Sequence, residues 1–411
     1  MRTIIKNIKE LVQVERQPKL RVCGTDMAHI ETIKEAYLII DDDKIAGFGP
    51  MSELGEQHAD NEVDATGRMV FPTFCDSHTH MVYAGSREIE YIDKIRGLSY
   101  DEIAKRGGGI LNSAKRVQEA SEEQLFEDAL QRLDMMARYG TGAVEIKSGY
   151  GMTTEAEMKM LRVIRRLKEA SPLTIKSTLL GAHGIPMEYR GRQEKFVDLV
   201  IEEMIPQAAA EGLADYIDVF CDQGFFTVED TERMLEAGAR YGMRPKIHAN
   251  EMACSGGIQV AVKWDALSCD HLEYTGDAEI ECLLHSATMP TVLPGAAFFL
   301  NMQHAPVRKM MDAGLPVAMA SDYNPGSSPS GNMQLIVSFA CVNYRMVPEE
   351  AINATTINSG YAMGVSDVLG SIAVGKLANL YITKPIPTFE YMPYAYGENK
   401  VEQVYIKGRR I

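Results

Sequence analysis

The middle of the chain alternates between short apolar runs and amphipathic segments, whereas both ends contain short apolar runs only. Apolar runs rich in β-branched and aromatic residues predict buried strands, and apolar residues repeated every three to four positions predict helices. This pattern predicts strands at 69–77, 142–148, 173–181, 216–221, 244–249, 266–270, 289–293 and 316–321. The clearest helices are predicted at 122–138, 154–169, 192–210 and 229–241.

Signals at the segment ends support these assignments. Ser121 stands where a side chain would cap the helix at 122–138, and Gly140 and Gly242 stand where two of the helices should stop. Parallel strands that alternate with helices predict an α/β fold, a (β/α)8 TIM barrel. An open doubly wound sheet is the alternative, but the first strand is not followed by the Gly-x-Gly-x-x-Gly turn typical of that fold.

Both ends of the chain are predicted to be β structure. Residues 36–40 and 45–50 are strand-like runs on either side of an acidic turn, and 378–383 and 401–406 are similar runs near the C-terminus. We therefore expect a small composite β-sandwich domain built from both termini. Its predicted parts are residues 1–66 and 372–411, and the barrel is predicted at 67–371.

Composition narrows the class of partner. The chain of 411 residues has a formal net charge of −15, which leaves no large basic surface for nucleic acid. We expect a small anionic substrate and a homodimer, with neither nucleic acid nor a membrane as a partner. The seven cysteines are scattered without a Cys-x-x-Cys pair, as in reduced thiols of a cytoplasmic protein. No signal peptide is recognisable, and no run approaches the ~18 apolar residues of a membrane span.

Histidines gather where the predicted strands end, which is where the reactive residues of a (β/α)8 barrel lie. Of the nine histidines, His78 and His80 end the first strand. His183, His248 and His271 follow the third, fifth and sixth strands. The alternative is a set of hydrogen-bonded core histidines. Five histidines at strand ends favour a common site instead, because metal ligands must converge from several elements.

Three of these histidines and one aspartate can reach a single metal ion. His78 and His80 are two residues apart, so on an extended strand both side chains project from one face. Strands one and eight are neighbours in a closed barrel, which places Asp322 beside this pair, and His248 can converge from strand five. Such a ligand set suits zinc. The metal would lower the pKa of bound water to about 7 and supply hydroxide, with Asp322 accepting the proton. This arrangement implies hydrolysis of a carbonyl or amidine carbon.

The residues around these positions resemble the amidohydrolase superfamily. The resemblance lies at 76–80 (DSHTH), 145–151 (EIKSGYG), 270–273 (DHLE) and 321–329 (SDYNPGSSP). It implies a (β/α)8 barrel with a β-sandwich formed by both termini, and a metal-dependent hydrolase that acts on a cyclic amide C–N bond. The motifs at 145–151 and 321–329 resemble a much smaller group within that superfamily than the His-x-His motif does. They imply ring opening of 4-imidazolone-5-propanoate to N-formimidoyl-L-glutamate, a step of histidine degradation.

The resemblance also implies a role for individual residues. The implied metal ligands, for zinc or iron, are His78, His80, His248 and Asp322. The implied catalytic residues are Asp322, His271 and Glu251. The implied substrate contacts are Arg87, Tyr100, Tyr150, His183, Glu251, His271, Asn324, Gly326 and Ser327. Because no lysine ends the fourth strand, the carboxylated lysine of dinuclear members is not expected.

Several alternatives stay open from the sequence. A guanidinium at Arg87 suits the propanoate carboxylate, but Arg87 has an alternative role in a rim salt bridge to Glu88 or Glu90. Tyr100 has an alternative role in loop packing. The alternative functions are another amidohydrolase, such as a nucleobase aminohydrolase, and a metal-free barrel that acts as a scaffold or binding protein.

Overall fold

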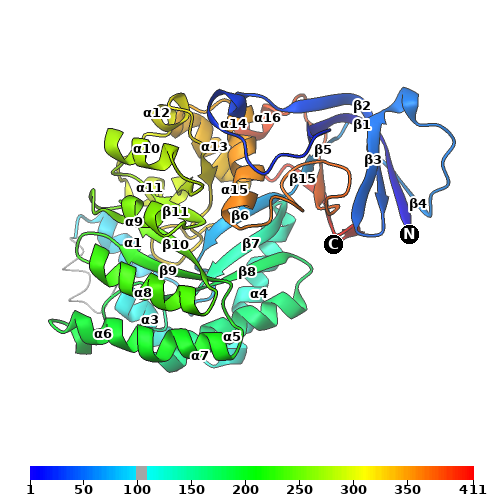
Figure 1. The fold of residues 1–411 in the computed structure, drawn as a ribbon. Coiled ribbons are helices and arrows are strands. Elements are labelled where there is room, and N and C mark those ends of the chain that lie inside the picture. The colour runs from blue at the N-terminus through cyan, green and yellow to red at the C-terminus, as the bar shows by residue number, and fades with distance from the viewer. Residues whose placement is uncertain (99–108) are drawn as a thin grey trace.

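The computed structural model describes residues 1–98 and 109–411, and its strands form two sheets (Figure 1). One is an eight-stranded parallel sheet in which each strand pairs with the next along the chain. Its strands are β6 (Phe74–Thr79), β7 (Thr141–Lys147), β8 (Thr174–Ala182), β9 (Tyr216–Cys221), β10 (Arg244–Ala249), β11 (Ser268–His271), β12 (Met289–Val292) and β13 (Ala318–Met319). The predicted (β/α)8 barrel is confirmed.

The barrel closes between its first strand and the segment after its last one. The amide of Asp322 donates to the carbonyl of His78 at 3.0 Å, and the amide of His80 donates to the carbonyl of Tyr323 at 2.9 Å. Thr79 and Tyr323 form a parallel bridge at the same place. The residues that close the barrel therefore include His78 of the first strand, His80 directly after that strand, and the aspartate that follows the eighth strand.

Helices pack around the outside of the barrel strands (Figure 1). The helices are α1 (Glu88–Ile95), α3 (Ile110–Glu119), α4 (Glu122–Arg138), α5 (Thr154–Ala170), α6 (Gln193–Leu199), α7 (Ile205–Ala210), α8 (Val228–Arg240), α9 (Gly257–Lys263), α10 (Asp277–Leu284), α11 (Pro294–Leu300), α12 (Val307–Asp312), α13 (Met333–Tyr344), α14 (Pro348–Thr355), α15 (Ile357–Ala362) and α16 (Tyr391–Tyr394). The helix predicted at 192–210 is divided by a π-helical turn at Val200–Met204. Pro206, which has no backbone N–H to donate, follows that turn.

The strand predicted at 69–77 is two strands that belong to different sheets. Residues Met69–Pro72 form β5 of the second sheet, and the barrel strand β6 starts at Phe74. Between them, the amide of Thr73 donates to Asn379 rather than to a barrel strand. An unbroken apolar run does not reveal such a change of sheet, because both strands are buried on both faces.

The second sheet is assembled from both ends of the chain, as the fold prediction required. Its strand order is β16-β15-β14-β5-β1-β2-β3, and β4 pairs with β1. Its strands are β1 (Arg2–Val14), β2 (Glu31–Asp41), β3 (Lys44–Pro50), β4 (Asn61–Asp64), β5 (Met69–Pro72), β14 (Leu380–Thr383), β15 (Val401–Ile406) and β16 (Arg409–Arg410). Both termini lie on this side of the molecule (Figure 1). The domain boundaries at residues 66 and 372 stay a prediction.

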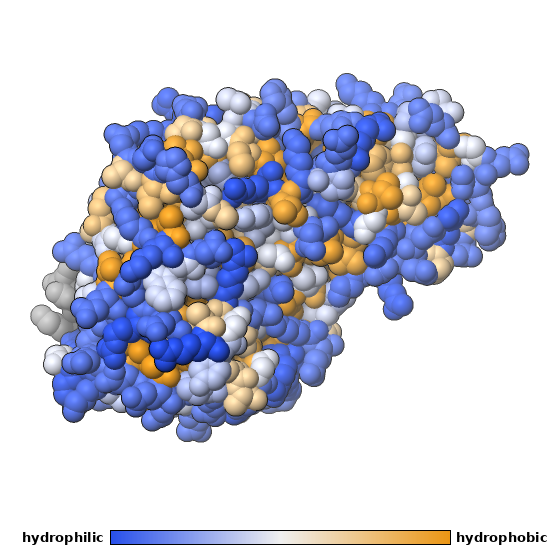
Figure 2. All heavy atoms as spheres, viewed as in Figure 1, coloured by the Kyte–Doolittle hydropathy of each residue, from blue (hydrophilic) through white to orange (hydrophobic). Residues whose placement is uncertain are grey.

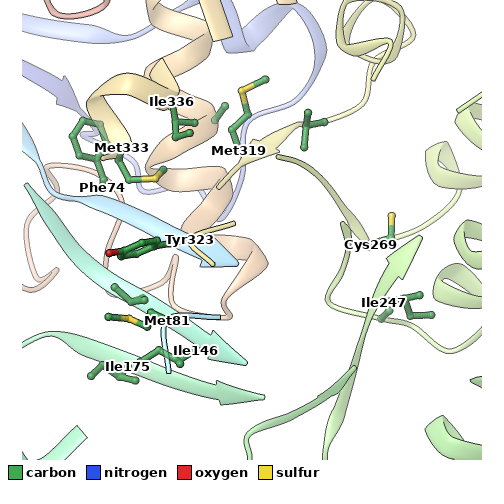
Figure 3. Close-up of a cluster of buried hydrophobic side chains, with 14 of the residues drawn as sticks. Phe74, Met81, Ile146, Ile175, Ile247, Cys269, Met319, Tyr323, Met333 and Ile336 are labelled. Carbon is green, nitrogen blue, oxygen red and sulfur yellow. The ribbon is translucent and has the colours of Figure 1, made fainter. Parts of the chain in front are cut away.

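Buried apolar side chains fill the space around the barrel strands. Figure 3 shows Ile146 and Ile175 on neighbouring strands of one part of the barrel, with Ile247 and Cys269 on another. Aromatic rings join the two sheets: Tyr381 of β14 stacks on Phe71 of β5 at 5.2 Å and on Phe74 of β6 at 5.4 Å between ring centroids. These three rings are buried, and they fix the start of β6 against the second sheet.

On the face shown in Figure 2, hydrophilic residues cover most of the surface, and hydrophobic residues appear between them in small groups. Isolated apolar side chains are common on protein surfaces. Within residues 1–98 and 109–411, no helix has the length and apolar character needed to cross a membrane.

The start of helix α4 provides a test of the local sequence signals. Ser121 Oγ accepts a hydrogen bond from the amide of Gln124 at 3.1 Å. Replacing Ser121 with alanine is expected to lower the free energy of unfolding by about 1 kcal/mol, because it removes the N-cap acceptor. Ser121→Asp, which retains an acceptor, is expected to stay near the wild-type value. Urea unfolding measures both, and equal losses in the two variants would contradict the capping role.

Candidate active site

A cavity of about 460 Å³ contains the residues that end the barrel strands. The predicted residues that line it are His80, Arg87, Tyr150, His183, His248, Glu251, His271, Asp322, Asn324, Gly326 and Ser327. His78 is completely buried and contacts His80 directly behind the lining. Tyr100 lies outside the described residues. The structure therefore brings every other predicted site residue to one place.

The imidazoles of the predicted metal ligands face one another through their Nε2 atoms. His80 Nε2 lies 3.2 Å from His78 Nε2 and 3.4 Å from His248 Nε2. Asp322 Oδ1 lies 3.6 Å from the Nε2 atoms of both His78 and His80. Burial lowers the pKa of His78 and His80 well below the ordinary value for histidine, so both rings are neutral. Neutral imidazole is the form that binds a metal.

The other nitrogen of each ring faces an oxygen. His78 Nδ1 lies 2.7 Å from Asp270 Oδ2, and His248 Nδ1 lies 2.9 Å from Asp218 Oδ2. His80 Nδ1 lies 3.4 Å from the carbonyl oxygen of Ser148. Oxygen atoms in these positions favour a proton on Nδ1, which leaves the Nε2 lone pair free. Three such lone pairs and a carboxylate oxygen at one point fit a divalent cation.

The described residues contain three overlapping groups of possible metal ligands, and within each group the ligand atoms lie within 4.8 Å of one another. The groups are His78, His248 and His271; His80, His183 and His248; and His78, His80 and Asp322. His78, His80 and His248 each belong to two of these groups. The donor set could therefore hold a divalent metal. The geometry alone also allows His183 or His271 as a ligand in place of a substrate contact.

Asp322 is fixed by the loop that follows it. Its Oδ2 accepts a hydrogen bond from Ser327 Oγ at 3.0 Å, which leaves Oδ1 toward the histidines. Asn324 braces the same loop, because its Oδ1 accepts from the amides of Gly326 and Ser327, each at 2.8 Å. Burial raises the pKa of the Asp322 carboxyl to about 7. A cation bound beside Oδ1 would lower this pKa and favour the charged carboxylate.

His271 and Glu251 form a second polar group in the cavity. His271 Nδ1 lies 3.6 Å from Glu251 Oε2 and 3.9 Å from the buried Glu273. Burial, with the negative charges of Asp322 and Asp222, raises the pKa of Glu251 to about 8. The backbone at His271 has φ 85°, a left-handed conformation that is strained for a residue other than glycine. Such strain is common where the chain turns sharply to present a side chain at a functional site.

Arg87 stands at the rim of the cavity. Its Nε and Nη2 atoms each lie 2.7 Å from Glu90 Oε2, so the rim salt bridge considered from the sequence is present. The same guanidinium lines the cavity, and its Nη1 lies against Gly326, where any Cβ would collide with it. Arg87 therefore pairs with Glu90 and faces the cavity at once, because a guanidinium carries five N–H donors.

Two aromatic rings complete one wall. His183 stacks on His80 with ring centroids 4.8 Å apart and planes 12° apart, and its Nδ1 lies 3.2 Å from the carbonyl oxygen of Gly149. The Tyr150 ring lies 5.4 Å from the His183 ring. Burial raises the pKa of Tyr150, which keeps the phenol protonated as a hydrogen-bond donor.

Some residues of the site were missed from the sequence. Lys94 and Phe220 also line the cavity, while Asp218 and Asp270 support two of the histidines from behind. Asp270 directly precedes His271, and Phe220 lies in the fourth strand, so their places along the chain were visible. The contact of Asp218 with His248 depends on the register of the neighbouring strands β9 and β10, in which His248 pairs with Phe220. No spacing rule supplies that information.

Comparison with known proteins identifies the class. The model of the amidohydrolase family matches residues 69–411. The chain belongs to the amidohydrolase family, as its motifs indicated, and it is a hydrolase by class. A 5-methylcytosine deaminase from Klebsiella pneumoniae has the same fold, with a TM-score of 0.75 at 18% identity over 100% of this chain and 98% of that one. An atrazine chlorohydrolase mutant from Arthrobacter aurescens, complexed with zinc and atraton, has a TM-score of 0.72 at 14% identity over 99% and 94%.

Sequence comparison identifies the group within this family to which the chain belongs. It is 54% identical to the imidazolonepropionase of Christiangramia forsetii over 411 residues, which is 100% of both chains. Within the amidohydrolase family, the chain therefore belongs to the imidazolonepropionases. The narrower motifs at 145–151 and 321–329 indicated this group, and that interpretation is confirmed. The metal-free scaffold considered from the sequence is not supported by this membership.

Proposed function

We propose that the protein opens the ring of 4-imidazolone-5-propanoate by hydrolysis and releases N-formimidoyl-L-glutamate. Water adds to the ring carbonyl carbon, the bond from that carbon to the ring nitrogen breaks, and the nitrogen takes up a proton. The strongest support for this proposal is the arrangement of the cavity. A single cavity has metal-binding donors on its floor and a guanidinium on its rim, as a small anionic lactam requires.

We propose that one zinc or iron ion is held by His78, His80, His248 and Asp322. Such an ion supplies Lewis acidity, which lowers the pKa of water and polarises the carbonyl. The support is the convergence of three Nε2 atoms and Oδ1, with an oxygen facing each Nδ1 from behind. The amidohydrolase family and the zinc in a protein of the same fold agree with a divalent metal.

The protein's own groups move the protons. The Asp322 carboxylate accepts the proton of the attacking water, and Ser327 Oγ donates a hydrogen bond to its Oδ2 and holds it in place. His271 donates to the carbonyl oxygen, where negative charge develops as water adds. Glu251, with its pKa raised to about 8, is protonated at neutral pH and can donate to the departing ring nitrogen.

The direct test uses the purified protein and imidazolone propanoate. Loss of imidazolone absorbance together with one N-formimidoyl-glutamate per substrate is expected, without ammonia. A chelator should stop the reaction, and zinc or ferrous iron should restore it. Ammonia release from a nucleobase, with imidazolone unchanged, would instead identify an aminohydrolase.

Replacing Arg87 with methionine is expected to raise KM about 10- to 100-fold and to leave kcat within a few-fold of wild type, as follows from losing one charged hydrogen bond. The reason is that the propanoate carboxylate is present in substrate and transition state alike. Steady-state kinetics on imidazolone propanoate measure both constants. Arg240→Met, at a 70% exposed helical pair, is the matched control and should change neither. An unchanged KM with lower stability would leave Arg87 only its pairing with Glu90.

The assembly and the location in the cell stay predictions. We propose a homodimer in the cytoplasm, on the basis of the sequence alone. Light scattering of the purified protein tests the first, and fractionation of the source cells tests the second.

A further inference from the structure

We infer that Lys147 is a positioning residue of the metal site: its ammonium holds together the two carboxylates that orient the imidazoles of His78 and His248. The inference rests on the metal site proposed above. It concerns a side chain that lies one layer below the ligands and does not line the cavity.

Lys147 is completely buried inside the barrel. Its Nζ lies 2.8 Å from Asp218 Oδ2, 2.8 Å from Glu145 Oε1 and 3.6 Å from Asp270 Oδ2. The lysine comes from β7, and the two aspartates come from β9 and β11. Side chains from alternate strands share one layer inside a (β/α)8 barrel, which is how three strands that are not neighbours meet at one ammonium.

The oxygen atoms that Lys147 approaches are the ones that face the histidines. Asp218 Oδ2 is the atom 2.9 Å from His248 Nδ1, and Asp270 Oδ2 is the atom 2.7 Å from His78 Nδ1. One cation therefore donates to Asp218 Oδ2 and forms a longer ion pair with Asp270 Oδ2, and each of these oxygens lies beside the Nδ1 atom of one ligand. Carboxylates behind metal-binding histidines set the tautomer and direction of the ring. The Lys147 ammonium lies next to the carboxylate of both aspartate–histidine pairs.

A second completely buried lysine, Lys246, comes from β10. Lys246 Nζ pairs with Glu145 and donates to the carbonyls of Ser77 at 3.1 Å and Ala362 at 3.0 Å. Among the described residues it forms no ion pair with Asp218 or Asp270. The two lysines are thus matched in burial and charge, and both contact Glu145. They differ in whether they contact the carboxylates behind the ligands.

This difference separates a positioning role from simple charge balance. If the lysines only neutralise the buried carboxylates, removing either one should affect metal binding equally. If Lys147 acts through Asp218 and Asp270, its removal should affect the metal selectively. Metal binding is measurable without substrate, so the outcome does not depend on which molecule the enzyme hydrolyses.

The experiment compares Lys147→Met with Lys246→Met in the full chain. Zinc affinity is measured by competition with a chromophoric chelator, and the visible spectrum of the cobalt(II) protein reports the ligand geometry. Lys147→Met is expected to bind zinc about 10- to 100-fold more weakly, with a changed cobalt spectrum, as for other residues behind metal ligands. Lys246→Met removes no direct contact with Asp218 or Asp270, so it should bind zinc more tightly than Lys147→Met and keep a cobalt spectrum closer to that of the wild type. Equal losses in both variants, or no loss in Lys147→Met, would overturn the inference.

Either methionine variant could fail to fold, because it leaves buried carboxylates without a cation. In that case Lys147→Arg and Lys246→Arg replace them, since each keeps its charge and changes only the shape of the cation. Weaker zinc binding and a changed cobalt spectrum are expected for Lys147→Arg alone, and the same behaviour in both variants would overturn the inference. A wild-type protein that binds neither zinc nor cobalt would refute the proposed metal site itself.

Discussion

His248→Ala is expected to reduce kcat/KM by at least about 10³-fold, because it removes one ligand of an ion worth several kcal/mol of transition-state stabilisation. Asp322→Asn is expected to have a comparable effect for two reasons. The amide is a weaker ligand than a carboxylate, and it cannot accept the proton of water. The measurements are steady-state rates and metal content per chain.

Both variants are expected to remain folded. Most of the burial in a chain of this length comes from the barrel core and not from one ion. Far-UV circular dichroism should therefore match wild type. His285→Ala provides the matched control, because His285 is 77% exposed at the C-cap of α10 and, among the described residues, pairs only with Glu281 of that helix. Full metal content and a near-normal rate in Asp322→Asn would exclude the four-ligand assignment.

The arrangement of the fold could be predicted because its signals are local. The strands at 216–221 and 244–249 have their predicted bounds, and the predicted helix at 122–138 is α4. Apolar runs and caps set these bounds within a few residues of chain. The change of sheet near Thr73 could not be predicted in the same way. It depends on pairing with β14, which lies some 300 residues later in the chain.

The candidate site likewise has one part that could be predicted from the sequence and one part that could not. Histidines at strand ends could be found because a barrel presents the ends of all its strands on one face. The layer below them could not be found, since Lys147 meets Asp218 and Asp270 only through the stagger of alternate strands. Arg87 shows a further limit: the sequence offered a salt bridge or a substrate contact, whereas the structure contains the salt bridge and also turns the guanidinium toward the cavity.

The membership of His271 in one of the ligand groups makes its replacement informative. His271 shares one group with His78 and His248, so it has the geometry of a ligand as well as that of a proton donor. Its Nδ1 lies 3.6 Å from Glu251 Oε2 and has no hydrogen-bond partner among the described residues. When the ring nitrogens are removed, a ligand role predicts loss of the metal, whereas a donor role predicts a lower kcat with the metal retained.

His271→Phe is expected to lower kcat about 10²- to 10³-fold, as for loss of one donor to a developing oxyanion. KM and metal content should change little, because the charge on the carbonyl oxygen develops only in the transition state. Phenylalanine keeps the ring's volume beside His78 and His248, so the measured loss reports the ring nitrogens rather than an empty space. Steady-state kinetics and metal analysis on the same preparation give the three quantities. Loss of the metal would make His271 a ligand, and an unchanged kcat would remove it from the catalytic residues.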